Sequence, residues 1–487
     1  MSAGDGVFDF RRGLPGAPPR RRAPRTTGGG GDDGGVRTGL AAVARAGDAA
    51  ADAGTWPHTT RVLPWMLAAF LAMVWLVPFD SASLPVHLPF ESKLDRVVII
   101  LMAFVWLAAL LVGGRAAPKL RSSPLNWAIG LFLFVAVSSI LVNRGQLVNL
   151  DEFSLAIKKL ALLLGWVLFY FLVTSILRPR EVSAFVTFMI GLACITAIGT
   201  IIEYRTGFNV FFEWGAKVLN PVGLHIDPQP PDDPFGRASI TGPTQHGLVV
   251  ALMLTIAFSL CLTRLVEPTQ RRRWLVALAA VVILAGAFAT QRKSALVVPV
   301  AVIAAMVAIR PRQAVRLLPV AVVMALAMPI VAPGALGSIR NQLFTSAVSQ
   351  SNSTTGRTQD YAAVRPDVEA HPALGRGYGS YDPHKYRIID NQYIGMAIET
   401  GFVGVGSYLL LLLAVVLAAR PALRSGDPRR APPALAAACA AVAIGVAAAL
   451  FDVFAYPQVP YVFLFVAGLA VVCASDATPA PEREPAA

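Results

Sequence analysis

After Arg61 the chain consists mainly of long apolar runs separated by polar segments. Twelve of these runs are each about as long as a helix needs to be to cross a bilayer. They lie near residues 62–78, 97–113, 125–142, 160–177, 182–202, 247–263, 274–290, 295–309, 317–333, 393–419, 433–451 and 460–475. The pattern predicts an all-α, polytopic integral membrane protein with about twelve transmembrane helices.

The composition of the 487 residues agrees with this prediction. Hydrophobic residues make up 55%, charged residues only 15%, and the mean hydropathy is +0.59. Such a chain has too little polar surface to cover itself in water. The four cysteines lie inside apolar runs without the spacing of a disulfide or metal site, and we expect them to be small core hydrophobes: Cys194, Cys261, Cys439 and Cys473.

The two ends of the chain differ from the middle. Residues 1–61 are rich in Gly, Arg, Ala and Pro, as in "PGAPPRRRAPRTTGGGGDDGG", and cannot bury a core. We therefore expect a disordered, basic cytoplasmic tail at 1–61, a membrane domain at 62–475 and a short cytoplasmic tail at 476–487.

The formal charge of +13 is explained by topology rather than by nucleic acid. With the N-terminus cytoplasmic, the five inner connections between runs contain 16 Lys/Arg and three acidic residues. Positive residues near span ends resist translocation, so both termini are predicted to be cytoplasmic. Lys158 and Lys159 oppose this rule, and an interfacial helix before 160–177 would account for them.

Two outer segments, 203–246 and 334–392, are too long to be simple connections. The second is predicted to contain a short helix in "TQDYAAVRPDVEAHP" and a glycine-rich turn in "GRGYGSYDPH". It also interleaves arginines with tyrosines, which suits a ligand that carries both phosphate and sugar. A folded, solvated loop with surface ion pairs is the alternative. Function is accordingly expected on the extracytoplasmic face.

Two further segments place polar residues at the membrane boundary. In "ATQRKSALVVPV", Arg292 and Lys293 sit between two closely spaced runs, where they form an anion site or reach toward lipid headgroups. In "FGRASITGPTQHGLVVALML", Arg237 and His246 precede the run at 247–263, with Thr244 in the region of the helix N-cap. A hydrogen-bonded structural role is the alternative for His246.

An ordered set of motifs resembles the O-antigen ligase and polymerase family of bacterial envelope glycan enzymes. The set comprises Arg292 in "TQRKSAL", Arg357 at the start of the loop helix, the "P-x-x-G-x-G" turn from Pro372 to Gly377, Asn391 and Tyr393 in "DNQYIGM", and Glu399, Gly401 and Gly404 in "ETGFVG". The likeness extends over about residues 62–475. Each motif alone is weak, but their order is fairly specific.

The resemblance implies a GT-C-like membrane glycosyltransferase in the bacterial cytoplasmic (inner) membrane, with membrane lipids around it. Such an enzyme transfers glycan from an undecaprenyl-diphosphate-linked donor to an acceptor hydroxyl on a glycan, lipid or protein. No metal, cofactor or nucleic acid is implied. The sequence likewise lacks a P-loop, a DxD-like loop pair and an HExxH motif.

Three residues are expected to be catalytic, and a larger group is expected to bind substrate. Arg292 and Arg357 are expected to stabilise the diphosphate leaving group, because preorganised cations best stabilise developing negative charge. Asp390 is expected to act as a base or to orient the acceptor. The residues expected to bind substrate are Arg237, His246, Lys293, Arg376, Tyr378, His384, Asn391 and Tyr393.

One departure from the family affects the choice of reaction. Lipopolysaccharide ligases typically have a histidine immediately before the asparagine that Asn391 matches, whereas this chain has Asp390. His384 or His371 could replace that histidine. The departure favours a polymerase-like member, with a ligase as the first alternative. A transporter is the second alternative, although ionisable residues gather in the loops and the runs contain almost none beyond Glu399 and Asp452.

Overall fold

The computed structural model describes residues 55–78, 82–83, 93–113, 118–223, 225–226, 239–267, 270, 272–317 and 362–475. All of them belong to one compact unit, Gly54–Ala487. Over these residues the protein is helical apart from two strands, β1 (Ala82–Ser83) and β2 (His225–Ile226), which pair antiparallel.

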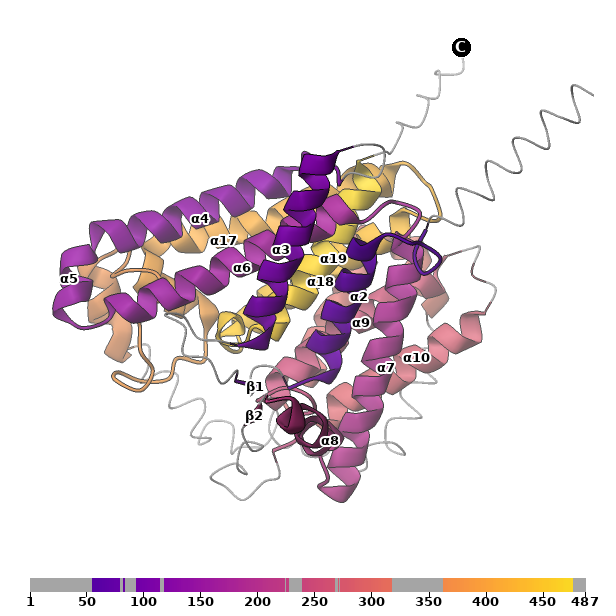
Figure 1. Ribbon diagram of the computed structural model, residues 1–487, viewed down its shortest axis with the longest axis horizontal. Coiled ribbons are helices and arrows are strands. Elements are labelled where there is room, and N and C mark those ends of the chain that lie inside the picture. The colour runs from indigo at the N-terminus through magenta and orange to yellow at the C-terminus, as the bar shows by residue number, and fades with distance from the viewer. Residues whose placement is uncertain are drawn as a thin grey trace, which may run out of the picture. The chain divides into compact units, whose positions relative to one another are not determined.

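In the described part of the chain, seven α-helices precede β2, and the helices that follow β2 pack against them (Figure 1). In order, the helices are α2 (Val62–Leu76), α3 (Leu94–Val112), α4 (Pro124–Val142), α5 (Arg144–Asn149), α6 (Phe153–Ile176), α7 (Val182–Thr206), α8 (Val210–Leu219), η2 (Asn220–Val222), α9 (Gly247–Leu265), α10 (Arg273–Ala289), α11 (Ser294–Ile309), α12 (Pro311–Ala314), η3 (Val315–Leu317), α17 (Gln392–Arg424), α18 (Ala431–Ala448), η4 (Val453–Ala455) and α19 (Gln458–Ala474).

The helices confirm a polytopic membrane protein. In the described part of the chain, seven helices (α3, α4, α6, α7, α9, α17 and α18) are long and apolar enough to cross a bilayer. Four shorter apolar helices, α2, α10, α11 and α19, coincide with other predicted spans. Eleven of the twelve predicted spans therefore correspond to helices, and the ninth, 317–333, lies largely outside the described residues. The total of twelve crossings stays a prediction.

Burial separates central helices from peripheral ones. Nearly every residue of α9 is buried, because it packs against α7, α10, α11, α18 and α19. By contrast, α3 leaves Phe104 66% and Leu111 80% exposed, as expected where a helix faces lipid rather than protein. Three of the four cysteines are buried and Cys194 is partly buried, and all four are free thiols, which confirms their expected role in the core.

The segment before α2 is part of the folded unit. The Trp56 ring is buried, and its centroid lies 4.5 Å from that of Phe185. The Arg61 guanidinium donates to the buried carboxylate of Glu181 at 3.0 Å. Packing at residues 55–61 thus begins a few residues before the boundary that composition predicted.

The lead-in to the fourth predicted span differs from expectation. Residues 153–159 form the first turns of α6 itself and are not a separate interfacial helix. Lys158 and Lys159 therefore lie on a membrane helix, and the environment of Lys159, described below, explains its position.

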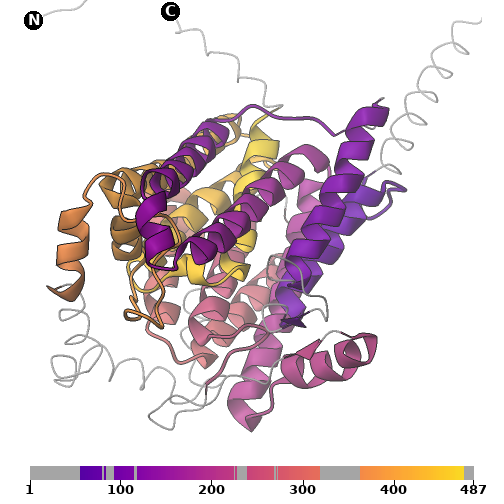
Figure 2. The same ribbon diagram turned by 60° about the vertical axis from the view of Figure 1, so that its left-hand side comes forward.

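The loop before α17 has the two features that the sequence predicted. Residues 362–370 are helical and the helix ends before Pro372, and the following turn places Gly375, Gly377 and Gly379 at positive φ. The helix α4 packs along α17 beside this turn and also contacts α6, as Figure 1 and the turned view in Figure 2 show. The loop segment is thereby held against the ends of three long helices.

Candidate functional site

A tight hairpin between α10 and α11 presents Arg292. Gln291 adopts φ 55°, a left-handed conformation that costs a non-glycine residue energy and often occurs at functional sites. The Arg292 side chain lies against the start of α9, since a Cβ added to Gly247 would come within 3.3 Å of the Arg292 Nε. The closest neighbour of such a Cβ would be Ile240 O at 2.6 Å, so glycine at position 247 is needed first by this backbone carbonyl and also leaves room for the guanidinium.

His246 is the N-cap of α9. Its Nδ1 accepts a hydrogen bond from the Leu248 backbone N–H at 3.2 Å. In the neutral ring the proton must then be on Nε2, so this side chain can donate a hydrogen bond rather than take up a proton at Nδ1. Its ring centroid lies 5.9 Å from that of Tyr456.

A buried carboxylate holds the segment that leads to His246. Glu203, at the end of α7, is 1% exposed and accepts from the backbone N–H groups of Thr241 at 3.1 Å and Gly242 at 2.8 Å. It also accepts from Asn209 Nδ2 at 3.0 Å. Because a carboxylate that accepts several bonds from N–H groups strongly orders them, the 239–246 segment has a defined position.

Two carboxylates and a lysine from other parts of the chain also belong to the site. Asp452, between α18 and α19, caps η4 by accepting from Phe454 N at 3.0 Å and Ala455 N at 3.2 Å through Oδ1. Burial raises the pKa of Asp452 to about 6. Glu399 Oε1 accepts from Tyr381 N at 3.2 Å and from Lys159 Nζ at 3.4 Å.

These groups line a single cavity of about 420 Å³. Arg292 and His246 belong to its wall, as do Asp390, Glu399, Asp452 and Lys159. Cationic and hydrogen-bond-donating groups thus share one cavity with three carboxylates. Such a cavity can bind an anionic group and also accept a proton from a neighbouring hydroxyl.

Comparison with known families supports the resemblance seen in the sequence. Residues 278–409 match a family model described as O-antigen ligase. This part of the chain is therefore similar to the O-antigen ligase family, which supports the resemblance that the motifs indicated. The matched region runs from within α10 into α17 and includes Arg292, Asp390 and Glu399, whereas Lys159, His246 and Asp452 lie outside it. No curated protein matches the chain.

Four of the residues predicted for an O-antigen ligase-type site line the cavity: Arg292, Asp390, His246 and Tyr378. Asp390 is exposed at the cavity wall, while Tyr378 is 5% exposed and burial raises its pKa well above the usual value. The Tyr378 hydroxyl therefore stays protonated. Arg237 and Arg357 lie outside the described residues, so their roles stay predictions.

The other five predicted residues have different surroundings. Arg376 is buried and pairs with Glu152 at 2.8 Å. The side chain of Asn391 caps α17, and the Tyr393 hydroxyl donates to Gly445 O at 2.7 Å. His384 is exposed in a turn after Asp382, and Lys293 does not contribute to the cavity wall. None of these five residues lines the cavity, and their roles in substrate binding stay predictions.

Sequence reasoning did not assign Lys159 or Asp452 to the site, and it included Glu399 only as part of the family motif. Each nevertheless gave a signal. Lys159 opposed the charge rule, and Asp452 interrupted the apolar segment "AALFDVFAYP". A charged residue kept in an otherwise apolar environment indicates a partner or a function, and here the cavity explains all three residues.

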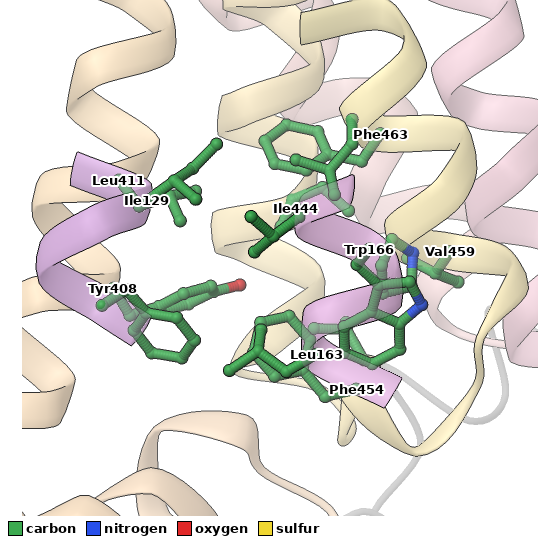
Figure 3. A pocket seen from close by; sticks show the side chains of 14 residues that line it. Ile129, Leu163, Trp166, Tyr408, Leu411, Ile444, Phe454, Val459 and Phe463 are labelled. Atoms are coloured by element: carbon green, nitrogen blue, oxygen red, sulfur yellow. The ribbon is translucent and has the colours of Figure 1, made fainter. Parts of the chain in front are cut away.

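A second, apolar pocket adjoins the cavity, because Trp166 and Phe454 line both (Figure 3). Its volume is about 40 Å³, too small for a sugar ring. The Tyr408 hydroxyl points into it and has no hydrogen-bond partner among the described residues. Within the described part of the chain, no group of three His, Cys, Asp or Glu residues is placed to hold a metal ion.

Proposed function

We propose that the protein is a membrane glycosyltransferase of cell-envelope polysaccharide biosynthesis, which uses an undecaprenyl-diphosphate-linked glycan donor. The observation that carries this proposal is the cavity that joins Arg292 and His246 to Asp390 and Asp452, in a chain whose residues 278–409 match the O-antigen ligase family model. The cavity would open on the extracytoplasmic face, as the distribution of Lys and Arg predicts, with both termini in the cytoplasm.

The diphosphate end of the donor would lie near Arg292. As the bond between the anomeric carbon and the diphosphate oxygen breaks, negative charge develops on the leaving group, and a fixed guanidinium stabilises it through two parallel hydrogen bonds. His246 would donate a further hydrogen bond from Nε2. Arg357 and Arg237 would complete the anion site.

The acceptor hydroxyl would approach from the carboxylate side. Its oxygen attacks the anomeric carbon with inversion, the carbon–oxygen bond to the diphosphate breaks, and the hydroxyl proton passes to a carboxylate. Asp452, with its pKa of about 6, is a stronger base than an ordinary aspartate and is suited to this step. Asp390, at the exposed wall, would orient the acceptor.

A polymerase-like reaction is favoured over ligation because Asp390 replaces the histidine typical of ligases. The size distribution of surface and lipid-linked glycans, with and without the protein, separates the two. Loss of a polymerase shortens the surface glycan to single repeats. Loss of a ligase leaves long chains on the lipid carrier.

A purified-protein assay with lipid-linked donor and acceptor tests transfer directly and distinguishes it from transport. The Arg292→Ala variant should lose roughly a hundred- to a thousandfold in rate, the usual effect of removing one donor to a developing oxyanion. Arg292→Lys should recover only part of this, because lysine cannot form the bidentate fork.

Lys293→Ala is the matched control, because Lys293 is the adjacent cation of the same hairpin and is absent from the cavity wall. It should transfer at nearly the wild-type rate. Transfer should also persist in a metal chelator. Equal activity of the two alanine variants would refute the role of Arg292, and a wild-type protein that moves donor across the bilayer without forming product would refute the proposed reaction.

A further inference from the structure

The helix α17 is interrupted at Gly401, whose φ of 66° and ψ of −170° are not helical. A break of this kind prevents the backbone groups around it from forming their usual hydrogen bonds within the helix. Backbone groups left unpaired inside a membrane protein are costly. The structure must therefore supply other partners for them.

The turn at residues 372–377 supplies these partners. Above the break, the N–H groups of Phe402 and Val403 donate to Pro372 O at 2.8 Å and Ala373 O at 3.2 Å. Below it, Ile398 O accepts from the Arg376 N–H at 2.8 Å, and Glu399 O accepts from the Gly377 N–H at 2.9 Å. The glycine-rich turn thus pairs with the interrupted helix on both sides of Gly401.

Ser139 of α4 and Asn143, the C-cap of that helix, hold the turn and the break together. Ser139 is fully buried, and its hydroxyl lies 2.6 Å from Leu374 O and 2.7 Å from Glu399 O, so its single proton can be donated to either carbonyl. Asn143 Nδ2 donates to Gly375 O at 2.9 Å and to Ser139 O at 2.8 Å. The end of α4 thereby fixes both the glycine-rich turn and the interrupted part of α17.

The junction has no spare space. A Cβ on Gly375 would lie 2.3 Å from the Glu399 carbonyl carbon, and a Cβ on Gly401 would lie 2.3 Å from Ala373 O. Both glycines also have positive φ, which other residues rarely adopt. A shift of the turn relative to α4 would therefore displace the backbone of Glu399.

Glu399 is the residue through which this junction reaches the cavity. Its carbonyl oxygen is bound by the junction, while its carboxylate accepts from Lys159 and Tyr381 at the cavity wall. The backbone and the side chain of one residue thus connect the α4 junction to the carboxylate side of the site.

We propose that Ser139 and Asn143 are positioning residues, which act through the backbone of Glu399 to fix the Glu399–Lys159 pair in the cavity. This inference rests on the proposed glycosyl transfer. It adds a second requirement to that function, namely that Ser139 and Asn143 hold the glycine-rich turn against the break in α17 through their hydrogen bonds.

The first test replaces Asn143 with Asp, which has the same shape but cannot donate a hydrogen bond to Gly375 O. The turnover number should fall roughly ten- to a hundredfold, as expected for a misplaced catalytic group, with the KM for the donor little changed. Asn126→Asp is the matched control. Asn126 lies seventeen residues earlier, by the start of α4, and its Nδ2 also donates to a backbone carbonyl, that of Arg121, at 2.7 Å. It should leave turnover close to wild type.

The second test is a double-mutant cycle. If Asn143 acts through Glu399, then Asn143→Asp should have little further effect on turnover in a Glu399→Gln background. Ser139→Ala should behave like Asn143→Asp, whereas Ser407→Ala should not. Ser407 is also a buried hydroxyl, but among the described residues it bonds within α17, to Gly404 O at 2.8 Å.

Hydrogen exchange provides a readout that does not depend on activity. The amides of Gly377, Phe402 and Val403 should exchange faster in Asn143→Asp than in Asn126→Asp. Additive effects on turnover, or unchanged exchange at these amides, would overturn the positioning role. If the wild-type protein shows no transfer while exchange changes as expected, the junction stands and the proposed function fails.

Discussion

Two clusters of carboxylates and cations contact the loop that precedes α17. They differ in how many of their carboxylate oxygens accept hydrogen bonds or pair with cations. In the Glu152 cluster (Glu152, Arg376, Lys385 and Tyr386), both carboxylate oxygens are paired. Arg376 donates to Oε2 at 2.8 Å, and Lys385 and the Tyr386 hydroxyl donate to Oε1 at 3.1 Å and 2.5 Å. Glu152 is 2% exposed.

The Glu399 cluster (Glu399, Lys159 and Asp452) is more open. The Glu399–Lys159 contact is longer, at 3.4 Å, and both residues face the cavity. Glu399 Oε2 and Asp452 Oδ2 have no hydrogen-bond partner among the described residues, although each carboxylate uses its other oxygen. The same residue types are therefore fully bonded within the protein in one cluster and partly open to a cavity in the other.

The largest effect is expected from Glu152→Ala. It would leave Arg376 charged and 7% exposed without its carboxylate, and breaking a buried ion pair in this way costs about 3–5 kcal/mol. Thermal unfolding in detergent measures the loss. Glu369→Ala is the control, because its ion pair with Arg365 is exposed and should contribute at most about 1 kcal/mol. Equal destabilisation of the two variants would contradict the structural role of the Glu152 cluster.

The next effect concerns the pH dependence of transfer. Because the pKa of Asp452 is raised from 3.8 to about 6, its basic form is lost as the pH falls through 6. The rate of transfer should therefore fall below about pH 6, and Asp452→Asn should reduce it roughly a hundredfold at neutral pH. Rate profiles of both proteins check this. If the rate of Asp452→Asn still fell at acidic pH as in the wild type, another group would be the base, with Asp390 the first candidate.

The folded stability should show the opposite dependence on pH at this residue. A carboxylate whose pKa is higher in the folded state stabilises the fold most when protonated, so its contribution is lost as the pH rises from about 4 to 6. In Asp452→Asn the thermal stability should depend less on pH over this interval. The variant thus separates the role of Asp452 in stability from its role in transfer.

A comparison of two lysines should give a smaller effect. Lys159 and Lys385 are similarly exposed, at 39% and 43%, and each pairs with a glutamate, but only Lys159 lines the cavity. Lys159→Met should therefore lower transfer by about tenfold, the rate equivalent of about 1.4 kcal/mol. Lys385→Met should leave transfer nearly unchanged. Reversed results in the purified assay would show that the Glu152 cluster also takes part in the chemistry.

The fold was predictable from sequence to the extent that its helices correspond to long runs of apolar residues. The helices of the membrane domain were located because a bilayer requires runs of about twenty apolar residues. The helix α8 was missed because Phe211 and Phe212 are buried on one side while Trp214 and Val218 are exposed, so its residues form no long apolar run. Its ten residues also lie inside what the sequence indicated only as a long loop.

The site was only partly predictable because residue type does not reveal where a side chain finds its partner. Arg292 and Asp390 were identified from motifs and line the cavity. Arg376 had the same features in sequence but pairs with Glu152, which is 224 residues away in the chain. Asp452 lies 62 positions beyond Asp390, and only the packing of α18 and α19 beside α17 brings both to one wall.

The smallest effect is expected at a third kind of polar group, one that has no hydrogen-bond partner among the described residues and does not line the cavity. The Tyr408 hydroxyl is buried in the apolar pocket of Figure 3 and has no hydrogen-bond partner among the described residues. Removing an unsatisfied buried hydroxyl should be neutral or stabilise the fold by about 1 kcal/mol, so Tyr408→Phe should unfold at the same or a slightly higher temperature. Tyr461→Phe is the contrasting variant, because that hydroxyl bonds to Asp95 at 2.9 Å and its loss should destabilise. If Tyr408→Phe were the more destabilising of the two, the pocket would have to contain a bound polar group such as water. The Tyr408 hydroxyl would then be hydrogen-bonded, as the carboxylate oxygens of the Glu152 cluster are.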